Sequence, residues 1–121
     1  YLSGGEPTVE LATGSGRGGR NLHLVLSCLD RTLTRKLDSE YCFLSGGTDG
    51  EDGTVDVPGG YFDSADVLRL KQSDRDCRSA VLSGLERFDS YSVLSDLGLV
   101  MQKLDTYTNV CDLRVLLKSG R

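Results

Sequence analysis

Two glycine-rich segments, residues 14–21 and 45–53, most constrain how this chain of 121 residues folds. Each follows a short strand-like run, and a pattern with helical spacing begins directly after the first. Alternation of strands and helices around such loops is typical of an α/β fold. A chain of this length buries roughly two thirds of its unfolded surface, enough for a core of its own. The sequence therefore predicts one α/β domain, with a mixed β-sheet and helices on both faces.

Apolar spacing places the individual elements. Between Leu22 and Leu37, apolar residues recur at steps of three and four, which predicts an amphipathic helix of about four or five turns. Shorter helices are expected after a cap at Ser64, over 76–87, and over 91–97 with an end at Gly98. Strands are expected at 8–11, 41–44, 99–101 and 110–117, and residues 1–5 are also strand-like.

Composition limits the classes of partner. The net charge of −4 argues against a general nucleic-acid binder, and no apolar run approaches the ~20 residues that a membrane span needs. We therefore expect neither nucleic acid nor membrane as a partner. The four cysteines lack the spacing of a metal motif, which favours reduced thiols and a cytoplasmic location, or a mitochondrial one in a eukaryote. Because the chain begins at Tyr1 without an initiator Met, we expect a fragment or a processed chain.

The first glycine loop matches a dinucleotide fingerprint, Gly14-x-Gly16-x-x-Gly19. In that fold an acidic residue follows the next strand and binds the ribose. Here Asp38 has the right spacing but precedes the strand, and Asp49 follows it too far along the chain. A nicotinamide site therefore remains an alternative that rests on glycine spacing alone.

A simpler interpretation of the same loop is an anion site. Gly18 and Gly19 allow close backbone approach, and a helix N-terminus offers unpaired N–H groups with partial positive charge. Arg17 and Arg20 add guanidinium groups suited to carboxylate or phosphate. Alternatively, the arginines pair with the surplus acids of the domain itself.

The second glycine loop is acidic, with Asp49, Glu51, Asp52 and Asp56. Its spacing does not fit an EF-hand, because Gly53 would stand at a ligand position. A solvated turn and a ligand site after a buried strand both remain open. The residues alone do not decide which carboxylate would face a site.

Four motifs occur along the chain in a fixed order, and together they resemble one family. It is the MOFRL domain, the C-terminal half of type-2 glycerate kinases, some of which carry the older label hydroxypyruvate reductase. The resemblance covers residues 1–121, without the N-terminal domain of those kinases. The motifs are Ser3-Gly4-Gly5-Glu6-x-Thr8-Val9, Gly16-Arg17-Gly18-Gly19-Arg20-Asn21, Ser45-Gly46-Gly47-Thr48-Asp49-Gly50-x-Asp52-Gly53 and Thr108-Asn109-Val110-x-Asp112-Leu113.

The resemblance implies an activity and its cofactors. Such enzymes phosphorylate D-glycerate to 2-phosphoglycerate with ATP and Mg²⁺, in a cleft between the two domains. The partners implied are D-glycerate and an N-terminal nucleotide-binding domain of the same protein. We therefore expect a phosphotransferase in the full-length protein and an inactive isolated fragment.

The resemblance also implies roles for particular residues. Arg17 would hold the glycerate carboxylate or the migrating phosphoryl group, and Asp49 would act on the substrate hydroxyl or help to hold Mg²⁺. These two are the expected catalytic residues. The substrate-binding residues implied are Arg20, Gly18, Gly19, Asn21, Thr48 and Asn109, and the metal ligands implied are Asp49 and Asp52.

Five positions depart from the family pattern. Leu22 stands where the family has Gln, Gly53-Thr54-Val55 replaces Gly-Pro-Thr, Tyr107 replaces a glycine, and Phe88 replaces an asparagine. Tyr107 favours one alternative, a non-catalytic MOFRL-like domain kept for binding or assembly. The other alternative is a nicotinamide-dependent hydroxypyruvate reductase, which depends on the glycine fingerprint.

Overall fold

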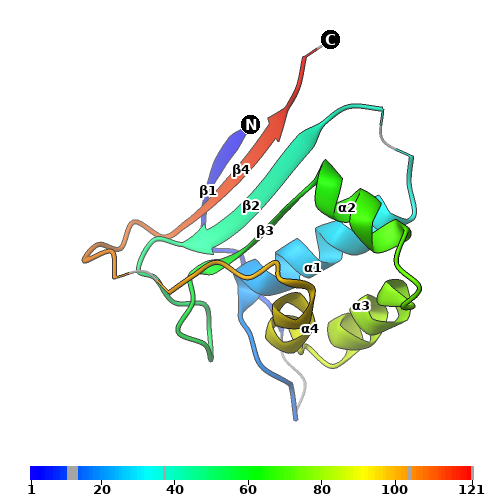
Figure 1. The fold of residues 1–121 in the computed structure, drawn as a ribbon. Helices are drawn as coiled ribbons and strands as arrows, with labels where there is room; N and C mark the ends of the chain where they lie inside the picture. Colours follow the sequence, from blue (N-terminus) through cyan, green and yellow to red (C-terminus); the bar gives the residue numbers. More distant parts are fainter. Residues whose placement is uncertain (11–13, 37, 104, 121) are drawn as a thin grey trace.

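The computed structural model describes residues 1–10, 14–36, 38–103 and 105–120. These residues form four strands and four helices around one core (Figure 1). In chain order the elements are β1 (Leu2–Gly5), α1 (Arg20–Leu33), β2 (Tyr41–Gly47), β3 (Gly59–Asp63), α2 (Ser64–Lys71), α3 (Cys77–Glu86), α4 (Ser90–Leu97) and β4 (Asp112–Lys118).

The strands form one sheet in the order β1-β4-β2-β3, and each neighbouring pair is antiparallel. The sequence predicted a mixed sheet, and this detail is corrected. β1 and β2 do run in the same direction on either side of the crossover helix α1. However, β4 lies between them and pairs with both, so no parallel ladder forms. The α/β class itself is confirmed.

The helices cover one face of the sheet, where both faces were predicted (Figure 1). α1 packs on β2 and β3, and α2 packs on β3. Phe43 and Phe62 point toward these helices and contact each other with ring centroids 5.9 Å apart. Side chains alternate across a strand, so Leu44 and Tyr61 point to the opposite face. In the described part of the chain no helix covers that face (Figure 1). Leu117, which the register of β4 with β2 places on it, is 62% exposed.

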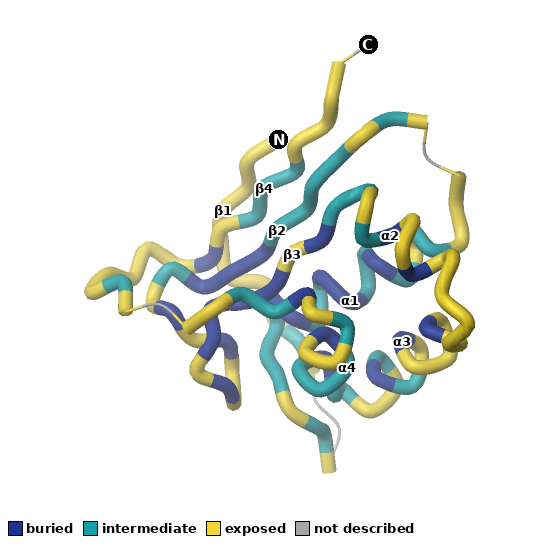
Figure 2. Tube along the Cα trace, viewed as in Figure 1, coloured by how far each residue is buried: buried dark blue, intermediate teal, exposed yellow. Residues whose placement is uncertain are grey.

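α1 supplies the centre of the core. Leu22, Val25, Leu26 and Leu29 are fully buried at the predicted steps of three and four. Burying each such side chain contributes about 1.5–3 kcal/mol. Figure 2 shows this buried stripe lying between the sheet and the shorter helices. The helix ends at Leu33, and the predicted end at Leu37 lies outside the described residues.

The shorter elements differ from expectation mainly at their ends. α3 and α4 form as predicted, and Gly98 ends α4 with a φ of 74°. α2 is capped by Asp63 rather than by Ser64, because Asp63 and Asp66 form a reciprocal capping box. Residues 8–10 are not a strand, and the strand predicted at 99–101 is reduced to one bridge from Val100 to Gly60.

All four cysteines are unpaired, as predicted. Among the helices described, none has the length and apolar character to cross a membrane.

Candidate functional site

The N-terminus of α1 holds a carboxylate from the acidic loop. Asp52 accepts hydrogen bonds from the backbone N–H of Asn21 at 3.0 Å and from that of Leu22 at 2.8 Å. It also accepts one from the Asn21 side chain at 3.2 Å. Gly19, the N-cap residue of α1, has no side chain that could cap the helix, so Asp52 caps it from a distant loop. Only 2% of Asp52 is exposed.

Asn21 connects this carboxylate to the sheet. Its side-chain oxygen accepts a hydrogen bond from the Ser45 hydroxyl at 2.6 Å, and both residues are buried. Burial raises the pKa of Asp52, partly offset by the hydrogen bonds from Leu22 and Asn21. Asn21 is thus placed as an internal bridge between α1, β2 and the acidic loop.

The two glycine loops pack directly on each other. The Gly18 N–H donates to the Thr54 hydroxyl at 3.1 Å, and the Thr54 N–H donates to the Gly18 carbonyl at 3.4 Å. A Cβ atom at Gly19 would lie 2.5 Å from the Asp52 carbonyl carbon. A Cβ at Gly53, where φ is +64°, would lie 2.7 Å from the Gly18 oxygen. Glycine is therefore required here by close backbone contact within the domain.

The same packing explains the glycines of the dinucleotide fingerprint. A Cβ at Gly16 would lie 2.8 Å from the Asp89 Cα atom, and the Gly16 N–H donates to the Arg87 carbonyl at 2.9 Å. In the dinucleotide fold, the pyrophosphate lies at the helix N-terminus. Here Asp52 fills that position, so these glycines need no nucleotide to account for them.

Arg20 is paired with acids of its own chain. Its Nε donates to Asp112 at 2.5 Å and its Nη2 to the other Asp112 oxygen at 3.1 Å, a bidentate contact. Nη2 also donates to Glu6 at 2.9 Å. The hydrogen bonds that Arg20 donates to Asp112 raise the pKa of Arg20 above its ordinary value. For Arg20, the interpretation that it pairs with the domain's own acids describes the structure.

Arg17 is placed differently. It is exposed, and its guanidinium carbon lies 4.5 Å from the centre of the Tyr91 ring. Its backbone N–H donates to Asp89 at 3.0 Å, and its carbonyl accepts from the Tyr91 N–H at 3.0 Å. Within the described ranges, no carboxylate lies within ion-pair distance of the Arg17 guanidinium. Arg17 is thus the more available of the two cations.

Thr48, Asp49 and Asn109 lie together, although the motifs that carry them are far apart in sequence. The Thr48 hydroxyl donates to the Cys111 carbonyl at 2.7 Å and accepts from the Val110 N–H at 2.8 Å. The Asn109 side chain donates to one oxygen of Asp49 at 3.3 Å. The Glu51 N–H donates to the other oxygen at 3.2 Å. These contacts orient the exposed carboxylate of Asp49.

The structure does not unite all the predicted site residues. Arg17 lies beside α4, whereas Asp49 lies beside the segment that leads into β4. No contact between their side chains is present in the part of the chain that the structure describes. Asp49 and Asp52 are also in different environments, since Asp49 is exposed and Asp52 is buried.

The predicted metal pair does not fit a Mg²⁺ ion held by this chain alone. The Asp52 oxygens already accept three hydrogen bonds. Among the described residues, no three His, Cys, Asp or Glu side chains are grouped as a metal site requires. Mg²⁺ prefers octahedral oxygen coordination, to which Asp49 would bring one carboxylate.

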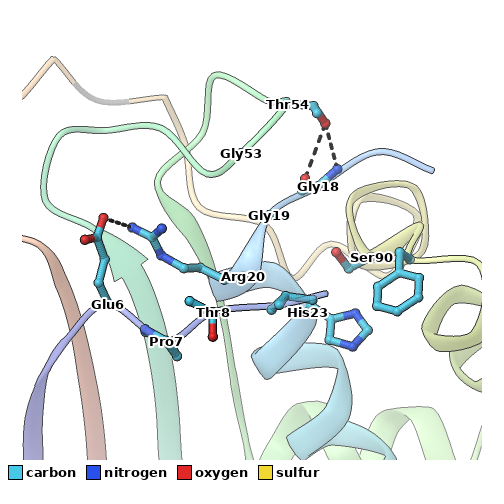
Figure 3. A pocket seen from close by; sticks show the side chains of 12 residues that line it. Glu6, Pro7, Thr8, Gly18, Gly19, Arg20, His23, Gly53, Thr54 and Ser90 are labelled. Carbon is cyan, nitrogen blue, oxygen red and sulfur yellow. Dashed lines mark hydrogen bonds and ion pairs between the residues drawn. The ribbon is translucent and has the colours of Figure 1, made fainter. Parts of the chain in front are cut away.

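A cavity of about 430 Å³ lies beside the α1 N-terminus (Figure 3). Residues 6–9, 18–20 and 53–54 line it, so three of the four motifs contribute to its wall. His23 and Phe88 form an aromatic side, with ring centroids 5.0 Å apart. The buried Ser90 lines it from the start of α4.

Sequence reasoning did not assign Glu6, Phe88 or Ser90 to this site. Glu6 belongs to the first motif, and this membership is the sequence feature that could have identified it as a site residue. Phe88 and Ser90 lie in a segment that departs from the family pattern, and sequence analysis assigned neither residue a role in the site. Their position in the cavity depends on how α4 packs on α1, which local sequence does not encode.

Comparisons with known proteins identify the family of this chain. A model described as the MOFRL family matches residues 1–112. The chain belongs to this family. This MOFRL domain is 37% identical to a glycerate kinase of Danio rerio over 116 residues, 96% of this chain and 23% of that protein. It is 40% identical to a putative hydroxypyruvate reductase of Agrobacterium vitis over 119 residues, 96% of this chain and 29% of that protein.

Two solved structures share the fold of this MOFRL domain. One is a glycerate kinase from Thermotoga maritima, with a TM-score of 0.78 and 34% identity over 96% of this chain and 26% of that chain. The other is the PH0495 protein from Pyrococcus horikoshii, with a TM-score of 0.78 and 28% identity over 96% of this chain and 25% of that chain. The chain thus spans about a quarter of the length of the relatives it matches.

Proposed function

We propose that this MOFRL domain is the C-terminal part of a glycerate kinase that transfers a phosphoryl group from ATP to D-glycerate, giving 2-phosphoglycerate. The observation that carries the proposal is the gathering of motif residues at one end of the sheet. Gly5, Gly47 and Asp112 lie in register there, and the N-terminus of α1 joins them through Arg20. An available cation, Arg17, and an oriented carboxylate, Asp49, remain exposed beside them.

Phosphoryl transfer depends mostly on positioning and on stabilising charge. Arg17 would bind the carboxylate of glycerate or the migrating phosphoryl group through its planar guanidinium. Asp49 would accept the proton of the attacking hydroxyl, held in place by Asn109 and by the backbone N–H of Glu51. The relatives named as glycerate kinases support this assignment of reaction.

The proposal also includes ATP, a second domain, a metal ion and a cellular location. ATP supplies the phosphoryl group and would be held by an N-terminal nucleotide-binding domain in a polypeptide of the relatives' length. Because Asp49 and Asp52 do not form a Mg²⁺ site by themselves, a metal would need ligands from that domain. The enzyme would act in the cytoplasm, or in mitochondria in a eukaryote.

The test is the kinetics of two variants in a full-length enzyme that carries this chain. A charge-assisted contact that is lost without compensation costs roughly 2–4 kcal/mol, which is ~30- to 1000-fold in rate. We expect Arg17→Ala and Asp49→Asn each to lose kcat/KM for D-glycerate within that range. Asp38→Asn, an exposed carboxylate between α1 and β2, is the matched control and should retain full activity.

Two outcomes would contradict the proposal. If Asp49→Asn keeps near-full kcat, the acidic loop is a solvated turn. If Arg17→Ala loses activity only because the protein melts earlier, the arginine is structural, and thermal melts of each variant separate these cases. Arg17→Lys keeps the charge but not the bidentate geometry, so an intermediate loss is expected for it.

A further inference from the structure

We propose that Asp52 is a positioning residue whose carboxylate takes the place of an external anion at the α1 N-terminus and fixes the turn that carries Arg17. The part of this inference that concerns substrate rests on the proposed function. On this inference, Arg17 binds the anionic groups of the substrate, and the N-terminus of α1 does not. It also separates Asp52 from Asp49, although both belong to one acidic motif.

The first support is that the carboxylate meets the donors that an anion would use. The N–H groups of Asn21 and Leu22 occupy the second and third positions of α1, where a helix leaves its N–H groups unpaired. A carboxylate at this end also meets the positive end of the helix dipole. With the Asn21 side chain as a third donor, both oxygens of Asp52 have partners.

The second support is the lack of space for a ligand between the loops. Only 2% of Asp52 is exposed. The backbones at Gly19 and Gly53 approach so closely that a single added Cβ at either position would collide with the opposite loop. A phosphate or carboxylate from outside would have to displace Asp52 and separate the loops.

The third support is the connection from Asp52 to Arg17. The turn fixed by Asp52 is held again at Gly18 by Thr54 on the acidic loop. Directly before Gly18, the backbone of Arg17 is bonded on both sides, to Asp89 and to Tyr91. The guanidinium therefore extends from a fixed backbone and rests on the Tyr91 ring. Loosening Asp52 would release one of the anchors of this turn.

The first experiment titrates this chain with inorganic phosphate and follows backbone amides by ¹H–¹⁵N NMR. We expect the amide signals of Asn21 and Leu22 not to move, because Asp52 already occupies both donors. Saturable shifts at these two amides would overturn the inference, since an external anion would then reach the helix end. This experiment needs no variant, so it decides the question even if a substitution prevents folding.

The second experiment compares Asp52→Asn with Asp56→Asn. Asp56 lies in the same loop but is exposed and pairs with Lys103 at 3.0 Å, which makes it a matched control. We expect Asp52→Asn to lower the Tm by roughly 5–10 °C, since a buried charged acceptor is lost, and Asp56→Asn to change it far less.

A spectroscopic signature separates positioning from a general loss of stability. In Asp52→Asn, the amide protons of Asn21 and Leu22 should shift upfield and exchange at least about tenfold faster with solvent. Amides of β4, away from this contact, should exchange as in the wild type under conditions where global unfolding is slow. If Asp52→Asn melts like the control with unchanged amide signals, the inference is wrong.

Neither experiment contains D-glycerate or ATP. Failure of the kinase proposal would therefore leave the Asp52 result intact. Conversely, a phosphate-responsive α1 N-terminus would remove the positioning role without affecting the kinetic test of Arg17 and Asp49.

Discussion

At the scale of single residues, the backbone at Tyr107 is unusual. Its φ is 53°, in the left-handed region where glycine is favoured. The family resemblance led us to expect a glycine at this position. An L-residue pays roughly 1–2 kcal/mol for that conformation. The side chain is 96% exposed, so it does not crowd the domain. This weakens the case for loss of function that the substitution suggested from sequence.

Substitutions at this position test that interpretation. We expect Tyr107→Gly to keep or slightly raise the Tm, because relief of strain offsets the added entropy of the unfolded chain. Tyr107→Val should lower the Tm, since a branched side chain is costly at positive φ. Thermal melts of both variants test whether the backbone at Tyr107 is strained. A clear loss of stability in Tyr107→Gly would show that the exposed ring makes a contact of its own.

The ion pair of Arg20 with Asp112 predicts a dependence on pH. Burial alone would raise the pKa of Asp112, but hydrogen bonds from Arg20 and Asn21 and nearby positive charge outweigh it and hold the pKa below its ordinary value. A depressed folded-state pKa stabilises the fold above the unfolded value of about 4. That stabilisation disappears as the pH falls through the lower, folded-state pKa.

The measurement is the Tm of wild type and Asp112→Asn across this range of pH. We expect the difference between them to be largest near neutral pH and to shrink as the pH falls below about 4. A difference that stays constant down to strongly acidic pH would show that the carboxylate charge contributes nothing, and that only its shape is needed.

The two arginines show what local sequence does and does not reveal about a site. Sequence predicted both as anion ligands, with pairing to internal acids as the alternative. The alternative holds for Arg20 because Asp112, in β4, is brought beside α1 by the sheet. Nothing within a few residues of either arginine distinguishes them. The difference depends on pairing between segments that are far apart in the chain.

At the scale of elements, the start of α1 depends on a glycine without a side chain. Gly19→Ala would place a Cβ against Asp52 and push the capping carboxylate away from the helix. We expect this variant to lose about 2 kcal/mol or more of unfolding free energy, combining a steric clash with a lost cap. Gly120→Ala is the control, because a Cβ there meets no atom within 4 Å.

Chemical denaturation of the two variants measures this effect. Equal midpoints for Gly19→Ala and Gly120→Ala would show that the loop relaxes without cost, and that Asp52 is less firmly held than its contacts indicate. The expected pattern is a lower midpoint for Gly19→Ala alone, with an unchanged slope.

Elements with a local signal were predicted well. The apolar spacing of α1 and the glycine after α4 are properties of neighbouring residues, and both predictions hold. β3 was missed because it begins with Gly59 and Gly60, which have no side chains to show alternation. It forms because β2 offers a partner along its whole length. Residues 99–101 show the opposite case. Their apolar pattern resembles that of a strand, but only Val100 pairs with a neighbouring strand.

At the scale of the whole molecule, sheet order could not be read from the sequence. The strand β4 comes last in the chain but lies between β1 and β2, and that insertion makes every ladder antiparallel. The same topology leaves all the described helices on one face (Figure 1). It also brings the ends of β1, β2 and β4 together, which is why motifs from both ends of the chain meet at the candidate site.

The last prediction concerns the chain by itself. Its core is continuous, and its four strands pair within the chain, so we expect cooperative thermal unfolding. We expect no turnover of D-glycerate, because Arg17 and Asp49 lie apart and a Mg²⁺ site is not formed by the residues described. An interdomain site would have only one of its walls here. A coupled assay of ADP release measures this, with a full-length glycerate kinase as positive control. Turnover on the order of 1 s⁻¹ or faster would show that these residues form a complete active site without a second domain.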